Sequence, residues 1–91
     1  MPGEHILVAD RSVAVQEIVK NTLEEGGYKV EIASNGLASL TYPDLEDIDM
    51  MVLDAGMEGV SGYDATRAIK TDRDNFEKPV FLLIPEDEED D

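Results

Sequence analysis

The chain has 91 residues and a mass near 10.0 kDa, which allows one small domain. Its 22 acidic residues outnumber 7 basic ones, and the net charge of −15 at pH 7 argues against binding to nucleic acid or an anionic membrane, because phosphates would be repelled. Without cysteine, the sequence excludes disulfides, cysteine–zinc sites and thiol catalysis. No apolar run is long enough to span a membrane and no signal peptide is evident, so we expect a cytoplasmic protein.

The first third of the chain predicts a strand followed by a helix. Residues 5–9 form a nearly continuous apolar run that ends at Asp10, which is typical of a strand buried on both faces. Ser12 can cap a helix whose apolar stripe recurs at helical spacing, and Gly26-Gly27 would end that helix. The predicted stripe consists of Val15, Ile18, Val19, Thr22 and Leu23.

The middle of the chain repeats this alternation. Residues 28–33 alternate apolar and polar side chains and predict a second strand, and Asn35-Gly36 predicts a turn. Residues 37–47 carry leucines that could line a helix, which a proline must end. Residues 48–53 form a second apolar run, interrupted only by Asp49, and it also stops at an acid, Asp54.

The last third contains a glycine-rich loop, a helix and a further strand. Ser61 and Asp64 could begin a helix in the manner of a capping box. Residues 72–78 read as a polar loop, and residues 79–84 as a third continuous apolar run. The alternating order predicts an α/β fold, an open, doubly wound parallel sheet with helices on both faces.

Two acids stand at the carboxyl ends of predicted strands, where open α/β sheets bind their ligands. Asp10 and Asp54 would therefore lie close together. Such a pair can hold Mg²⁺, which takes oxygen ligands, or one carboxylate can accept a phosphoryl group. The simpler alternative is that either Asp only caps the helix that follows it, and this applies most to Asp10, two residues before Ser12.

These residues resemble the receiver domain of bacterial two-component response regulators, of the chemotaxis-regulator type. The resemblance is carried by residues 6–10 (ILVAD), 50–54 (MMVLD) and 57–63 (MEGVSGY), and it extends over nearly the whole chain. It implies a flavodoxin-like sheet of strand order 2-1-3-4-5 in a domain of residues 1–85. It also implies that Asp54 is the position phosphorylated by a histidine kinase and that Asp10 and Asp54 are the Mg²⁺ positions.

The sequence departs from the family at the site. Receivers carry two adjacent acids after the first strand, but the second position here is Arg11, which could pair with Asp54 as a charge partner. At the end of the fourth strand, where the family has a Ser or Thr that binds the phosphoryl group, this chain has Ile84. We therefore expect the Mg²⁺ site to be weak or lost.

The sequence departs from the family at its end as well. A full receiver continues with a helix, a fifth strand that carries a lysine, and a last helix. By the resemblance this chain is C-terminally truncated, which would leave residues 80–84 as an open apolar edge strand. We expect a protein partner or a second copy of the chain to cover that edge.

Three functions follow from these residues. The first is a pseudo-receiver, not an enzyme, that acts in two-component or phosphorelay signalling by protein–protein interaction and needs no cofactor. The first alternative is a working receiver that is phosphorylated on Asp54 with Mg²⁺. The second alternative is an acidic decoy that binds a basic protein through residues 86–91, which are all acidic and read as a disordered tail.

Overall fold

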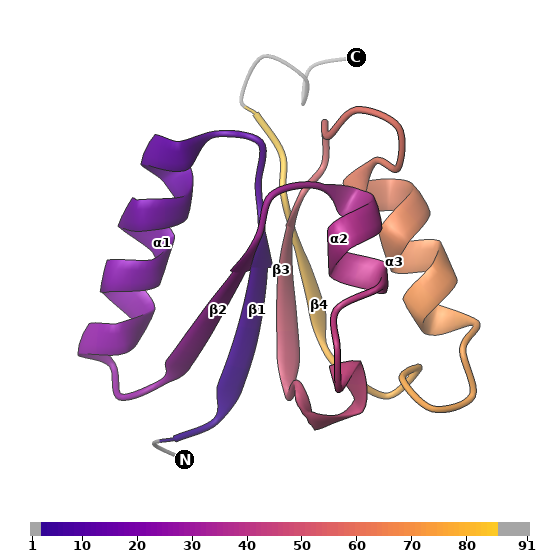
Figure 1. Cartoon of the computed structure of the whole chain (residues 1–91), viewed down its shortest axis with the longest axis horizontal. Coiled ribbons are helices and arrows are strands. Elements are labelled where there is room, and N and C mark those ends of the chain that lie inside the picture. The colour runs from indigo at the N-terminus through magenta and orange to yellow at the C-terminus, as the bar shows by residue number, and fades with distance from the viewer. Residues whose placement is uncertain (1–2, 86–91) are drawn as a thin grey trace.

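The computed structural model describes residues 3–85 as a four-stranded parallel sheet with helices on both faces (Figure 1). The strand order β2-β1-β3-β4 matches the first four strands expected from the flavodoxin-like pattern, so the predicted fold class is confirmed. The strands are β1 (His5–Ala9), β2 (Lys29–Ala33), β3 (Met50–Asp54) and β4 (Val80–Leu83), and the helices are α1 (Val13–Glu25), α2 (Gly36–Leu40), the 3-10 helix η1 (Leu45–Asp47) and α3 (Gly62–Lys70).

The two faces of the sheet are covered to different extents. On one face, α2 and α3 pack over a cluster that includes the fully buried side chains of Leu7, Met51 and Leu53. On the other face, α1 packs against β1 and β2, over Ile6 and Val8. Within the part of the chain that the structure describes, no helix is long and apolar enough to cross a membrane.

Polar side chains begin all three α-helices by accepting a hydrogen bond from a backbone N–H of the first turn. The Ser12 hydroxyl accepts from the N–H of Val15 at 3.3 Å, as expected. The Ser61 hydroxyl likewise accepts from the N–H of Asp64 at 3.0 Å. Asn35 was expected in a turn, but its Oδ1 caps α2 instead.

The predicted stripe of α1 is wrong at two positions. Val15, Val19 and Leu23 are half-buried and turn toward the sheet, but Ile18 is 65% exposed and Thr22 is also exposed. The reason is that α1 lies over one half of a sheet face and has no second helix beside it among residues 3–85, so the stripe that packs is narrow.

Glycines bring α3 close to the end of β3. A Cβ at position 62 would lie 2.4 Å from the carbonyl oxygen of Asp54 and 2.8 Å from the Cα of Ala55. Gly59 has a φ of +75°, in the region that favours glycine. The loop between β3 and α3 can therefore turn tightly beside the end of the strand.

The segment before β4 is not a simple polar loop. Lys78 is 8% exposed, and its ammonium donates to the carbonyl of Leu45 at 3.1 Å. Burial lowers the pKa of Lys78 from its ordinary value. This lysine ties the start of β4 to η1, which the sequence did not indicate.

β4 is an edge strand of the described sheet, since its one strand partner there is β3. It ends at Leu83, one residue earlier than the predicted run of residues 79–84. Phe81 is 55% exposed and Ile84 is 40% exposed. The acidic run expected to form a tail, residues 86–91, lies outside the described residues.

Candidate functional site

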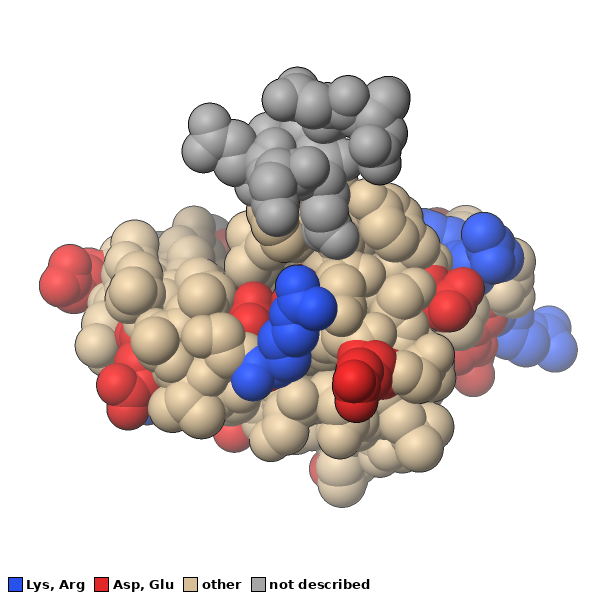
Figure 2. Space-filling view, turned by 90° about the horizontal axis from the view of Figure 1, so that it is seen from above, with Lys and Arg blue, Asp and Glu red and all other residues tan. Residues whose placement is uncertain are grey.

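Asp10 and Asp54 meet at the carboxyl edge of the sheet, at the top in Figure 1. Asp54 is the last residue of β3, and Asp10 directly follows β1, the neighbouring strand. Each of the two residues is only 4% exposed. Figure 2 looks onto this edge, where uncharged residues cover most of the surface and acidic side chains stand between them. Two carboxylates with little access to water need cations or hydrogen-bond donors nearby.

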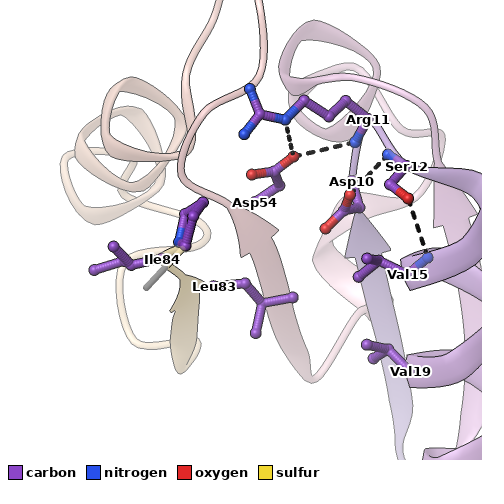
Figure 3. Close-up of a pocket in the computed structure, with 9 residues that line it drawn as sticks. Asp10, Arg11, Ser12, Val15, Val19, Asp54, Leu83 and Ile84 are labelled. Carbon is purple, nitrogen blue, oxygen red and sulfur yellow. Dashed lines mark hydrogen bonds and ion pairs between the residues drawn. The ribbon is translucent and has the colours of Figure 1, made fainter. Parts of the chain in front are cut away.

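Arg11 supplies those donors to Asp54 (Figure 3). Its guanidinium Nε lies 3.2 Å from Asp54 Oδ2, and its backbone N–H donates to the same oxygen at 3.2 Å. The other oxygen, Oδ1, accepts from the backbone N–H of Gly56 at 3.0 Å. Both oxygens of the Asp54 carboxylate are therefore occupied by groups of the protein itself.

The Arg11 guanidinium also reaches a main-chain oxygen. Its Nη1 donates to the carbonyl of Gly56 at 2.6 Å. A Cβ at position 56 would lie 2.6–2.8 Å from three guanidinium atoms, so the guanidinium can lie there because residue 56 has no side chain. The sequence predicted only a glycine-rich loop in this region and not this role of Gly56, because a backbone carbonyl leaves no signal in the sequence.

Asp10 is held locally and also faces Asp54. Its Oδ1 accepts from the backbone N–H of Ser12 at 2.8 Å, so the simpler interpretation of Asp10 as a local cap describes part of its role. Burial raises the pKa of Asp10, and the nearby Asp54 carboxylate raises it further, against the lowering effect of the Ser12 N–H. Arg11 thus stabilises the charged carboxylate of Asp54, which it contacts directly, more than that of Asp10.

The Arg11–Asp54 pair joins a buried group to a half-exposed one. The Asp54 side chain is 6% exposed, whereas that of Arg11 is 53% exposed. Solvent screening limits the net worth of such a pair to about 1 kcal/mol. Its larger effect is to give the buried Asp54 carboxylate a counter-charge. Removing Arg11 would leave that carboxylate buried and uncompensated, which lowers stability.

The residues present do not fit a resident Mg²⁺ ion, which the Asp10 and Asp54 positions of the family would hold. Magnesium takes oxygen ligands such as carboxylates and carbonyls in a near-octahedral arrangement. Here the Asp54 and Gly56 oxygens already bind the Arg11 guanidinium, which brings a fixed positive charge. Among residues 3–85, no group of three or more His, Asp or Glu side chains is placed to hold a metal.

Ile84 lies just beyond the end of β4 at the rim of an apolar groove, and its side chain points away from Val15 and Val19 (Figure 3). The groove has a volume of about 490 Å³, with Val15 and Val19 of α1 on one side and Leu83 pointing toward them from β4. Ile84 and Pro85 also line it. Asp10, Arg11, Ser12 and Asp54 line its polar end. The Ile84 side chain has no hydroxyl to donate to a phosphoryl oxygen at this position.

Comparisons with known proteins identify relatives of this chain. The family model described as the response regulator receiver domain matches residues 6–91. The response regulator SaeR of Staphylococcus aureus is 32% identical over 87 residues, which are 96% of this chain and 37% of SaeR. The chain therefore spans little more than a third of that relative.

Solved structures show the same likeness. The N-terminal domain of a response regulator receiver protein from Methanoculleus marisnigri is 33% identical with a TM-score of 0.80, covering 87% of this chain and 64% of that one. The signal receiver domain of a histidine kinase from Syntrophus aciditrophicus is 32% identical with a TM-score of 0.84, covering 89% of this chain and 61% of that one.

Proposed function

The chain belongs to the response regulator receiver domain family, and from that premise we propose that it is a pseudo-receiver in two-component or phosphorelay signalling. It acts by binding proteins, not by catalysis, and it does not use the phosphorylation of Asp54. In this proposal, Arg11 takes the place of a magnesium-ligating acid and holds the Asp54 carboxylate in one arrangement.

The observation that carries the proposal is the position of the Arg11 guanidinium. It contacts Asp54 Oδ2 at 3.2 Å and the Gly56 carbonyl at 2.6 Å, two hard oxygen donors of the kind that Mg²⁺ binds. These contacts support the proposal that a cation of the chain itself takes the place of the metal that phosphoryl transfer would need. Ile84 adds to the case, because it leaves no hydroxyl beside the pocket.

The first experiment measures whether Asp54 accepts a phosphoryl group or its mimic. The full chain is incubated with Mg²⁺ and either acetyl phosphate, read by intact mass, or beryllofluoride, read by fluorine NMR. We expect no added phosphoryl mass and no bound-fluoride signal. A signal that appears in the wild type and disappears in Asp54→Asn would overturn the proposal. The structure keeps the strand-end carboxylate that such a signal would require.

A second candidate function is a working receiver phosphorylated on Asp54 by a histidine kinase. Its support is the buried Asp10–Asp54 pair at the strand ends. The substitution Arg11→Asp tests what separates the two functions, because it removes the cation and adds a carboxylate beside Asp54. We expect Arg11→Asp to bind Mg²⁺ in the millimolar range or better, as measured by metal titration, and the wild type to bind more weakly. Equal Mg²⁺ affinity in the two proteins would mean that Arg11 does not block the site.

The exposed edge of β4 is part of the same proposal. Among residues 3–85 no strand pairs with its outer edge, so the backbone there can pair with another strand beside the exposed Phe81, either from a second copy or from a different protein of the cytoplasmic signalling pathway. Sedimentation of the full chain at tens of micromolar tests the first form. A dimer is expected there, and a monomer at all concentrations would contradict self-pairing.

A further inference from the structure

The peptide unit between Asp10 and Arg11 is hydrogen-bonded on both of its sides. Its N–H, from Arg11, donates to Asp54 Oδ2 at 3.2 Å (Figure 3). Its carbonyl, from Asp10, accepts from the side-chain amide of Gln16, whose Nε2 lies 2.7 Å from the oxygen. A trans peptide unit is planar, and its N–H and C=O point in opposite directions. A rotation of this unit would therefore disturb both hydrogen bonds together.

The start of α1 places Gln16 for this contact. Gln16 is the fourth residue of the helix, and its own backbone N–H donates to the carbonyl of Ser12 at 2.9 Å. The residue is half-buried, and its side chain reaches back six positions, beyond the helix, to the Asp10 carbonyl. The donor is therefore carried by a regular helix, which holds a side chain more precisely than a loop does.

The Gln16 contact both orients and strengthens the donor at Asp54. A hydrogen bond to the carbonyl of an amide polarises that amide, so its N–H becomes a better donor. The Arg11 N–H donates to the same carboxylate oxygen that the guanidinium Nε contacts at 3.2 Å. Because Asp54 is only 4% exposed, it depends on donors of the protein itself. The orientation of one peptide unit thus affects how well this buried carboxylate is stabilised.

We propose that Gln16 is a positioning residue for the Arg11–Asp54 contact. Its side-chain amide holds the Asp10–Arg11 peptide unit in the orientation that points the Arg11 N–H at Asp54. The sequence does not indicate this role, because the acceptor of Gln16 is a backbone carbonyl. The inference rests on the proposed function in one respect, that the Arg11–Asp54 contact is the working arrangement of the pocket, and it adds the residue of α1 that maintains this arrangement.

A series of substitutions at position 16 separates hydrogen bonding from packing. Methionine, glutamate and lysine have helix propensities close to that of glutamine, so the series leaves the tendency to form α1 nearly unchanged. Gln16→Met keeps an unbranched side chain of similar length but has no N–H or O–H to donate. Gln16→Glu has nearly the shape of glutamine, and at neutral pH its carboxylate only accepts hydrogen bonds. Gln16→Lys keeps a donor.

The measurement is the exchange of backbone N–H groups with water in the full chain, followed by NMR at neutral pH. We expect the Arg11 N–H to exchange about three- to tenfold faster in Gln16→Met and Gln16→Glu than in the wild type, the range that corresponds to the loss of one hydrogen bond. Gln16→Lys should restore slow exchange. Glu17→Met, at the exposed next position of α1, is the matched control and should leave the rate unchanged.

The N–H of Val15 is an internal reference, because it donates to the Ser12 hydroxyl at 3.3 Å at the start of the same helix. Its exchange rate should change little across the series. Equal acceleration at Val15 and Arg11 would indicate a frayed helix and would overturn the positioning role. Wild-type exchange at Arg11 in Gln16→Met, or fast exchange in Gln16→Lys, would overturn it as well. Beryllofluoride binding at Asp54 would overturn the pseudo-receiver and leave the exchange result standing.

Discussion

At the scale of single residues, Gly56 decides where the Arg11 guanidinium can lie. A methyl group at this position would overlap atoms at the flexible end of an arginine side chain, which can move away, and not atoms of the backbone. The position therefore controls the Arg11–Asp54 contact without controlling the fold.

We predict that Gly56→Ala separates Arg11 from Asp54 while the protein stays folded. The measurement is the NMR signal of the Arg11 Nε–H, which contacts Asp54 at 3.2 Å in the wild type and should exchange faster with water in the variant. Gly26→Ala, at the end of α1, serves as the control. An unchanged Nε–H exchange rate in Gly56→Ala would show that the pair does not depend on this glycine.

A second prediction concerns Asp10, whose carboxylate is stabilised by Arg11 less than that of Asp54. Folding raises the pKa of Asp10 above its ordinary value of 3.8. At pH values just above 3.8, the folded protein therefore binds more protons than the unfolded chain. Stability then falls as pH rises through that window, and at neutral pH the charged Asp10 lowers the free energy of unfolding. We predict that Asp10→Asn is more stable than the wild type at pH 7.

The gain from Asp10→Asn should shrink as pH falls through the raised pKa of folded Asp10 and should be lost below 3.8, where Asp10 becomes neutral in both states. Thermal melts at several pH values measure it. Asparagine keeps an oxygen for the Ser12 N–H and can donate to Asp54, so the substitution preserves the local geometry. Asp64→Asn, at an exposed position on α3, is the control. A stability gain that does not vary with pH would contradict the assignment.

The sequence predicted the charged members of the site but not its complete geometry. Asp10 and Asp54 could be placed together because parallel strands end at the same edge of a sheet. The contact between Arg11 and the Gly56 carbonyl could not be predicted, since it depends on the course of a loop and on a backbone atom. The buried Lys78 was hidden for the same reason, because its acceptor is the carbonyl of Leu45.

At the scale of elements, α3 depends on a close approach to β3. We predict that Gly62→Ala lowers the free energy of unfolding by about 1–3 kcal/mol, because the new methyl group would press on the backbone of Asp54 and Ala55. Chemical denaturation measures this loss. A methyl group added at Gly59 would have no neighbouring atom within 4 Å, so Gly59→Ala should cost about 1–2 kcal/mol from its positive φ alone.

Gly59→Asn separates the two causes at these glycines. Asparagine tolerates positive φ better than alanine, so it should recover part of the stability lost at position 59. The same change at position 62 should recover none, since crowding and not φ is the cause there. Recovery at Gly62 would contradict this explanation.

The elements themselves were predicted more reliably than their packing. Apolar runs that stop at acids located β1 and β3, because both strands are buried on both faces. The width of the packed stripe on α1 was not predictable, since it depends on how many helices share that face of the sheet. Asn35 was misplaced because an asparagine that accepts a nearby N–H serves a turn and a helix start alike.

At the scale of the whole molecule, the net charge of −15 acts against the compact state. We predict that the melting temperature rises when salt increases from about 10 mM to about 150 mM, because the screening length falls from about 30 Å to about 8 Å. A chain that ends at Pro85 carries six fewer acids and should show a smaller rise. A melting temperature that falls with salt would contradict dominant self-repulsion.

The guanidinium beside Asp54 affects how the pocket depends on metal ions in the surrounding solution. A counter-ion joined by covalent bonds cannot be diluted, chelated or exchanged, so under the proposed function the charge balance around Asp54 would not follow the supply of free metal. The pocket is then set when the polypeptide is synthesised. Under the proposed function, the cell would adjust this signal through the amount of the protein, by making it or degrading it.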